Sequence, residues 1–200
     1  MPLGPAFVRR ICAFLGAIVV ISPLVIQNAE AKLIYIAAPF RDGQVILRAR
    51  GVVDQGDAAR LRAALGKAAR FGQVASIAFD SPGGNVAEGV ALAREVQRAG
   101  LPLVVAGRQT CASICFLIFA AAPVRYVART ARVGVHSASD LAGRESQGSF
   151  AATTILARAA AGYGVPPDIL GKMVATGPDQ MAWLTDADLA SMGVVRYDPD

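Results

Sequence analysis

Apolar and polar residues alternate along the chain in blocks that predict short strands followed by helices. Continuous apolar runs are typical of strands buried in a parallel sheet, whereas apolar positions three and four apart mark amphipathic helices. We expect strands at 32–38, 44–50, 74–79, 103–106, 124–127, 132–135 and 194–195, and helices at 57–69, 86–99, 111–122, 150–163 and 166–174, with a short last helix capped by Thr185 and Asp188. This alternation indicates one α/β domain on a mainly parallel sheet, without an internal repeat.

The first 31 residues interrupt this pattern and have the features of a targeting segment. A basic pair at 9–10 precedes an apolar stretch at 11–26, and an Ala-Glu-Ala sequence at 29–31 provides the small residues of a cleavage site. We therefore expect a secretory signal peptide at 1–31, cleaved after Ala31, and a mature domain at 32–200 that is periplasmic or secreted. The apolar stretch is somewhat long, which leaves open an uncleaved segment that anchors the protein in the inner membrane.

Composition supports one globular domain and argues against a nucleic-acid-binding protein. The 200 residues are 54% hydrophobic and 18% charged, which suits a sizeable core rather than disorder. The formal net charge is +5, but lysines and arginines do not cluster, and aromatic residues make up only 6% of the chain. A nucleic-acid interface needs a basic patch, so we expect no nucleic-acid partner.

Two cysteines remain after the predicted leader, which contains Cys12. Cys111 and Cys115 lie four residues apart in a compartment that we expect to be oxidising. Their spacing favours two small buried residues on one face of a helix. A disulfide is the alternative, since Cα atoms about 4.4–6.8 Å apart can be bridged, and a non-helical Cys111 would ease that approach. A metal site lacks ligands, because the single histidine, His136, is distant in the sequence.

Three short segments contain the residue types that serine acyl-transfer chemistry needs. Ser113 lies in the first turn of an apolar helix, where free backbone N–H groups and the helix dipole favour negative charge. The amide of Ile114 is one candidate oxyanion donor, and the amide of Gly84, just after a buried strand, is the second. His136 follows another apolar strand and is the candidate base. Sites at the carboxyl ends of parallel strands are expected in α/β proteins.

Each of these features alone has a simpler structural explanation. A Pro-Gly-Gly sequence such as 82–84 most often forms a turn. A serine in an alanine-rich helix is usually a small filler residue, and a single histidine is more often structural than catalytic. The functional interpretation therefore depends on all three segments occurring together and in one order.

The ordered set of motifs resembles the proteolytic subunit of the Clp protease, within the Clp-protease/crotonase superfamily. The resemblance covers most of residues 44–195. The matching segments are Ser81-Pro82-Gly83-Gly84, Ala112-Ser113-Ile114, Arg132-Val133-Gly134-Val135-His136, Trp183-Leu184-Thr185 and Met192-Gly193-Val194-Val195. The Cys-Ala-Ser-x-Cys arrangement at 111–115 is similar to that of secreted and periplasmic Clp-protease-like proteins. The resemblance implies a single-domain spiral of ββα units with a mainly parallel sheet.

The resemblance also implies functional roles. Ser113 would be the nucleophile and His136 the general base, and the amides of Gly84 and Ile114 would form the oxyanion hole. The implied activity is that of an exported, ATP-independent serine peptidase that acts on peptide or protein substrates without a metal or other cofactor. Family members assemble into rings or trimers, so a homo-oligomer is also implied.

The acid of the implied triad has no clear match. Counting back from the Trp-Leu-Thr motif places the family's aspartate near Gly177, which has no carboxylate. Asp179 is the nearest substitute, and Thr176 and Gln180 are polar alternatives. Because this acid orients the imidazole, its loss would weaken catalysis and leave a serine–histidine dyad.

The missing acid motivates the main alternative, a catalytically weakened or inactive protein of the same fold that serves in periplasmic binding or assembly. A serine–lysine dyad is less favoured, because Lys32, Lys67 and Lys172 do not lie in recognisable motifs. A crotonase-type enzyme would share the glycine oxyanion hole. However, coenzyme A thioesters are not expected outside the cytoplasm, and Ser113 with His136 would be unexplained.

Overall fold

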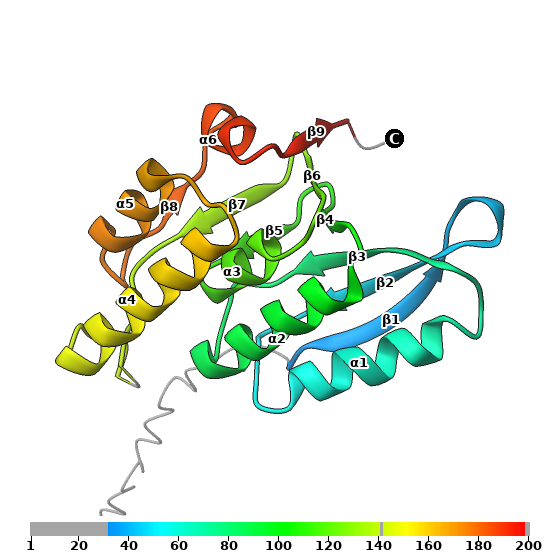
Figure 1. Cartoon of the computed structure of the whole chain (residues 1–200), viewed down its shortest axis with the longest axis horizontal. Coiled ribbons are helices and arrows are strands. Elements are labelled where there is room, and N and C mark those ends of the chain that lie inside the picture. The colour runs from blue at the N-terminus through cyan, green and yellow to red at the C-terminus, as the bar shows by residue number, and fades with distance from the viewer. Residues whose placement is uncertain (1–31, 141, 199–200) are drawn as a thin grey trace, which may run out of the picture.

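Strands and helices alternate in the computed structural model, which describes residues 32–140 and 142–198 (Figure 1). The predicted leader at 1–31 lies outside the described residues. The strands are β1 (Ile34–Pro39), β2 (Val45–Arg50), β3 (Val74–Asp80), β4 (Leu103–Val105), β5 (Thr110–Ala112), β6 (Arg125–Ala128), β7 (Arg132–Val135), β8 (Ala182–Trp183) and β9 (Val195–Tyr197). The helices are α1 (Asp57–Ala68), α2 (Val86–Ala99), α3 (Ile114–Ala120), α4 (Gln147–Gly162), α5 (Pro167–Ala175) and α6 (Asp186–Ser191), with a 3-10 turn η1 (Arg41–Gly43) between β1 and β2.

Two sheets organise the described strands. The larger has the order β1-β2-β3-β4-β6-β9, and the smaller has the order β5-β7-β8. Neighbouring strands pair in parallel, except β1 with β2 and β7 with β8. The prediction of one α/β domain with a mainly parallel sheet is therefore confirmed.

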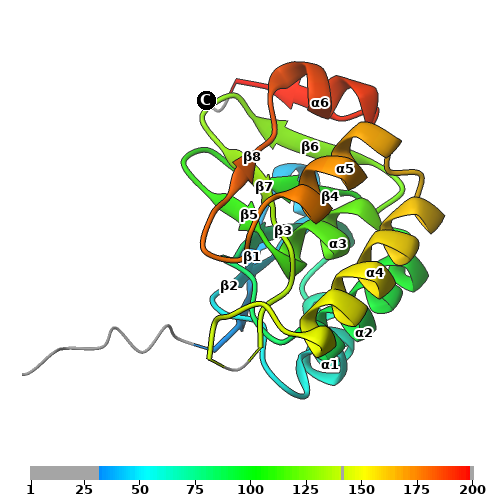
Figure 2. The same cartoon turned by 90° about the vertical axis from the view of Figure 1, so that its left-hand side faces the viewer.

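The helices α1, α2, α4 and α5 lie together on one side of the strands (Figure 2). Each contacts the next in the spatial order α1, α2, α3, α4, α5, so α3 occupies the middle of the row. Every residue of α3, from Ile114 to Ala120, is buried, which explains its wholly apolar sequence. No helix within 32–140 or 142–198 has both the length and the apolar character needed to cross a membrane.

The stretch predicted as one helix at 111–122 divides into a strand and a helix. Thr110–Ala112 forms β5, and the helix α3 begins only at Ile114. The strand is stabilised from outside its own sequence, because β7 pairs with it in parallel and Ser81 forms a further bridge with Cys111. Apolar runs do not by themselves distinguish buried strand from buried helix. The correction places Ser113 at the junction between the two elements.

Side-chain capping explains where α2, α4 and α6 begin. Asn85 caps α2 by accepting a hydrogen bond from the N–H of Glu88 (2.9 Å), and Thr185 with Asp188 forms the predicted capping box of α6. Ser146 and Ser149 form a second capping box, so α4 begins earlier than the apolar pattern predicts. The two-residue strand β8 was not predicted, because its pairing with β7 leaves no periodic signal.

Candidate active site

Ser113 occupies a sharp turn between β5 and α3. It is the N-cap residue of α3, with φ 57° and ψ −129°, a backbone conformation that residues other than glycine rarely adopt. Such a conformation costs about 1–3 kcal/mol and persists only where the surrounding structure enforces it. The N–H of Ser113 donates to the carbonyl of Gly134 (3.1 Å) in β7. This strand–turn–helix arrangement exposes a serine hydroxyl at the start of a helix, as in nucleophile elbows.

Gly83 packs directly against Ser113. A Cβ on Gly83 would lie 2.6 Å from the Cβ and 3.1 Å from the Oγ of Ser113, and Gly83 has φ 113°. Both the positive φ and the close approach exclude other residues. From the sequence, only Gly84 was predicted to be a functional glycine, although the Gly-Gly pair was the available signal for this contact.

Gly84 forms an isolated parallel β-bridge with Val53. The N–H of Val53 donates to the carbonyl of Gly83 (2.7 Å), and the N–H of Asn85 donates to the carbonyl of Val53 (2.8 Å). In a parallel bridge these bonds use the groups flanking Gly84, so its own N–H points to the opposite side. Gly84 and Ser113 line the same cavity. The N–H of Ile114, at the first position of α3, is the second donor available to an oxyanion there.

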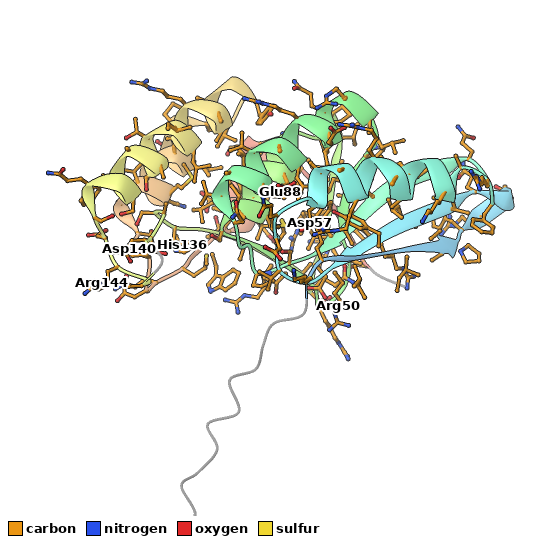
Figure 3. The ribbon with its side chains drawn as sticks, turned by 90° about the horizontal axis from the view of Figure 1, so that it is seen from below. Arg50, Asp57, Glu88, His136, Asp140 and Arg144 are labelled. Carbon is orange, nitrogen blue, oxygen red and sulfur yellow. A yellow bond between two sulfur atoms is a disulfide. The ribbon has the colours of Figure 1, made fainter. Side chains whose placement is uncertain are left out.

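His136 follows β7 directly, at the same edge of the small sheet as Ser113. In the parallel pair β5–β7, Ala112 lies opposite Gly134. The segments that follow the two strands therefore leave the sheet side by side. Ser113 and His136 line one cavity of about 690 Å³. Its remaining wall comes from segments 52–54, 84–87 and 138–140 together with Lys32. The tertiary structure therefore brings together the three separate sequence segments. Figure 3 shows His136 and Asp140 on the stretch of chain between β7 and α4.

Burial dominates the electrostatics of His136. It lowers the pKa of the imidazole below its usual value, and the backbone carbonyl of Pro178 partly opposes this shift. The Pro178 carbonyl acts here as a nearby partial negative charge, because the buried Nδ1 has no partner that meets hydrogen-bond geometry within the described parts of the chain. A lowered pKa keeps the imidazole neutral near pH 7, which is the form that accepts a proton.

Asp179, the candidate triad acid, does not hydrogen-bond His136 within the described residues. Its side chain is exposed, and its Oδ1 lies 2.9 Å from where a Cβ on Gly177 would be, so the carboxylate folds over its own loop. The Thr176 hydroxyl donates to the carbonyl of Lys172 (2.7 Å), and Gln180 is exposed. The role of Asp179 stays a prediction.

No hydrogen bond joins the Ser113 hydroxyl to the His136 imidazole among the described residues, although the two side chains share a cavity. Catalytic hydrogen bonds are often long or poorly aligned before substrate binds, so this geometry does not exclude the pair. Lys32 reaches the same cavity, but its Nζ pairs with Asp54 Oδ2 (2.8 Å) and its side chain is 78% exposed. A lysine base would need burial instead, which keeps the serine–lysine alternative unfavoured.

A second, much smaller pocket of about 20 Å³ lies beside Ser113 and His136. Its lining is mostly apolar and includes Leu156 from α4 and Met173 from α5. One water molecule needs about 10–15 Å³ of free space, so the pocket has room for a single water or a methyl-sized group. Neither residue carried a local sequence signal, because the tertiary packing of α4 and α5 places them here.

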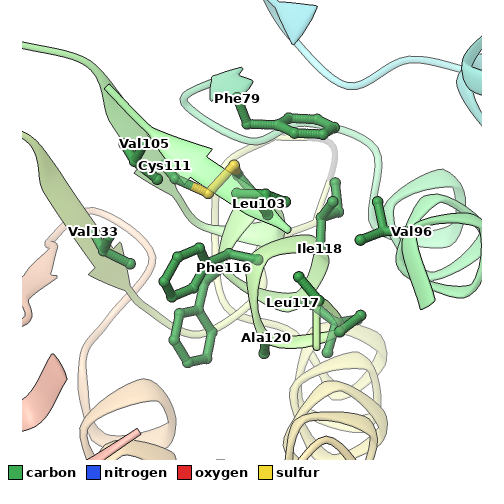
Figure 4. Close-up of a cluster of buried hydrophobic side chains, with 14 of the residues drawn as sticks. Phe79, Val96, Leu103, Val105, Cys111, Phe116, Leu117, Ile118, Ala120 and Val133 are labelled. Carbon is green, nitrogen blue, oxygen red and sulfur yellow. A yellow bond between two sulfur atoms is a disulfide. The ribbon is translucent and has the colours of Figure 1, made fainter. Parts of the chain in front are cut away.

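Cys111 and Cys115 form a disulfide, whereas their spacing favoured two separate buried thiols. The reason is the strand conformation of Cys111, which brings the two Cα atoms to 5.2 Å, within the range that a disulfide spans. Both residues are fully buried, and the bond lies among Phe79, Leu103 and Phe116 (Figure 4). Within 32–140 and 142–198, no three metal-ligating side chains gather at one place.

Similarity to known proteins is found among solved structures. No protein-family model matches the sequence, and no curated protein matches it either. Among solved structures, a mutant of ClpP1 from Listeria monocytogenes aligns with a TM-score of 0.58 and 18% identity, covering 78% of this chain and 92% of that one. The ClpP protease catalytic domain from Plasmodium falciparum gives 0.53 and 15%, with coverage of 74% and 82%.

A third solved structure comes from a protease with a different described target. A mutant of the 1510-N membrane-bound stomatin-specific protease aligns with a TM-score of 0.52 and 15% identity, covering 76% of this chain and 78% of that chain. These structural alignments show that the fold is shared. At identities this low they say nothing of the activity, which has to be argued from the site. The chain has the Clp-protease/crotonase fold.

Proposed function

We propose that this protein is a serine hydrolase, most specifically a peptidase of peptide or protein substrates, with Ser113 as nucleophile and His136 as general base. One observation carries the proposal: a serine in a strained elbow and the chain's single histidine line the same cavity. The fold shared with proteases supports a peptide substrate.

The proposed reaction follows serine acyl transfer. Ser113 Oγ attacks the substrate carbonyl carbon while the His136 imidazole takes its proton. The N–H groups of Gly84 and Ile114 bind the developing oxyanion. His136 then returns the proton to the leaving amine as the C–N bond breaks. Water next attacks the acyl-enzyme carbonyl carbon while His136 takes its proton, and that proton passes to Ser113 Oγ as the ester C–O bond breaks. No metal or cofactor takes part.

We propose a dyad as the minimal machinery, with Asp179 as the candidate orienting acid. A carboxylate behind the imidazole normally fixes its tautomer and stabilises its cation. The exposed position of Asp179 and the unpartnered Nδ1 of His136 favour a dyad in the resting conformation. Catalysis would then be slower than in a complete triad.

Export and self-association belong to the same proposal. The predicted signal peptide at 1–31 favours a periplasmic or secreted enzyme, or one anchored in the inner membrane where the segment is retained. Phe150 and Ile155 on α4 and Val174 on α5 are 56%, 60% and 55% exposed. Exposed apolar side chains of this size support a homo-oligomer, and the mass in solution measured by light scattering tests it.

A fluorophosphonate probe tests the proposed function, because it labels only an activated serine. We expect labelling of the purified protein, and about 10³-fold slower or absent labelling of Ser113→Ala and His136→Ala. Exposed Ser139 lines the same cavity and provides the matched control, so Ser139→Ala should label normally. Labelling that survives in Ser113→Ala would overturn the assignment of the nucleophile.

A non-catalytic binding or assembly protein is the second candidate. The unpartnered Nδ1 of His136 and the lack of an orienting carboxylate favour it. Folded protein that neither reacts with the probe nor hydrolyses peptides and esters would support this alternative. Serine-dependent turnover would exclude it.

A further inference from the structure

We propose that the Cys111–Cys115 disulfide is a positioning device for the elbow, which holds Ser113 and the N–H of Ile114 in their reactive arrangement. The inference rests on the proposed function. The two cysteines would act through the nucleophile and the oxyanion donor without touching substrate, so they are positioning residues.

The location of the bond carries the proposal. Cys111 lies in β5, and Cys115 is the second residue of α3. The three residues between them are Ala112, Ser113 and Ile114. The covalent loop therefore encloses the nucleophile and the Ile114 N–H, and it fixes the direction in which the helix leaves the strand.

The backbone of the elbow explains why such a link is useful. Ser113 holds a strained conformation, with φ 57° and ψ −129°. On the strand side, the N–H of Ala112 donates to the carbonyl of Ser81 (3.1 Å) and the N–H of Ser113 to that of Gly134 (3.1 Å). On the helix side, the N–H of Phe116 bonds the carbonyl of Ser113 itself (2.9 Å). These bonds fix each side separately, whereas the disulfide joins the two sides across the strained residue.

Burial identifies the bond as permanent rather than switchable. Both cysteines are 0% exposed, and the sulfurs are enclosed by Phe79, Leu103 and Phe116 (Figure 4). Thiol–disulfide exchange requires a thiolate to reach a sulfur atom. Reductants in solution have no such access in the folded protein. The disulfide therefore serves the geometry of the elbow at all times.

The test compares the wild type with Cys111→Ala/Cys115→Ala, using the rate of fluorophosphonate labelling at a temperature at which both are folded. We expect labelling at least tenfold slower in the double variant, with a lower kcat and an unchanged KM for an ester substrate. Leu189→Ala is the matched control, because Leu189 is buried in α6 and lines neither pocket at Ser113. It should lower the melting temperature and keep the wild-type labelling rate.

A double variant that is folded and labels at the wild-type rate would overturn the inference, since the disulfide would then only stabilise the fold.

If the double variant does not fold, wild-type protein is reduced in mild denaturant, returned to buffer, and labelled before and after reoxidation. Recovery of the rate on reoxidation, at constant circular dichroism, is the expected result. Equal rates, or unfolding of the reduced protein, would contradict a positioning role. A wild type that does not label fails the proposed function instead, so the two failures are distinguishable.

Discussion

The elbow at 111–115 and the segment at 176–181 both border His136, and they differ in how firmly the structure holds them. The elbow lies in a parallel ladder, is closed by a disulfide, and packs against Gly83 with no room for a Cβ. The second segment is joined by isolated bonds, such as that from the N–H of Ser137 to the carbonyl of Thr176 (2.9 Å). The exposed residues at 179–180 lie within it.

This difference in how firmly the two segments are held corresponds to two separate needs of the chemistry, a fixed nucleophile and an oriented imidazole. A strained nucleophile and its oxyanion donors must be preorganised, so their surroundings fix them from several sides. The buried Nδ1 of His136, which would face an orienting acid, has no hydrogen-bond partner in the described parts of the chain. Leaving such an atom unpaired costs about 1–3 kcal/mol. We therefore expect substitutions at the elbow to slow the reaction of Ser113 strongly, and substitutions behind the imidazole to slow it only slightly.

Gly83→Ala should have the largest effect. The new Cβ would lie 2.6 Å from the Cβ of Ser113 and 3.0 Å from the carbonyl oxygen of Ala112, which must displace the elbow. We expect labelling at least about 100-fold slower and a loss of about 1–3 kcal/mol in the free energy of unfolding. Labelling kinetics and denaturant unfolding measure the two effects.

Gly66→Ala is the matched control for that substitution. Gly66 lies within α1, and a Cβ there would meet nothing within 4 Å. Alanine should stabilise the helix by about 0.5–1 kcal/mol and leave labelling unchanged. If Gly83→Ala behaved like Gly66→Ala, the elbow would not be held as tightly as its contacts indicate.

Met173→Ala should change which acyl groups react. Met173 lines the pocket of about 20 Å³ beside Ser113 and His136. Removing its longer side chain makes room for about two or three methylene groups, at about 0.8 kcal/mol each. We expect the preference for butyrate over acetate esters to rise about tenfold, measured as a ratio of kcat/KM values. An unchanged ratio would mean that acyl groups do not enter this pocket.

Asp179→Asn should have a smaller effect, below tenfold in kcat, because the carboxylate is exposed and not bonded to His136. Removing the charge of an engaged triad aspartate lowers kcat by about 10⁴. The full pH profile of Asp179→Asn should match that of the wild type. A loss near 10⁴ would show instead that Asp179 moves behind the imidazole during catalysis and completes a triad.

The pH dependence should show the smallest effect. Burial lowers the pKa of His136 below about 6.5, the usual value for histidine. The neutral base therefore persists to lower pH, and activity is lost only as the pH falls through the lowered pKa. Labelling at pH 6.5 should exceed half of its plateau above pH 8. If labelling instead reached half of its plateau at a pH above 6.5, a negative charge would have to face the imidazole.

Local sequence patterns predicted most of the fold. Val86–Ala99 and Arg132–Val135 occur with the expected bounds, because their apolar spacing and caps are local properties. The stretch at 111–122 was misassigned, since the strand at Thr110–Ala112 depends on pairing with β7 and Ser81. The two-residue strand at Ala182–Trp183 depends in the same way on its partner.

For the site, the sequence by itself determined the residue types and their order: a glycine pair, a serine before an apolar helix, and one histidine after a strand. Those features are local, so they can be read along the chain. Only the tertiary structure decided that Ser113 and His136 share a cavity, that Cys111 reaches Cys115, and that Asp179 does not hydrogen-bond the buried Nδ1 of His136. Each of these outcomes depends on how strands register and helices pack, and distances between such elements are not encoded in any single segment.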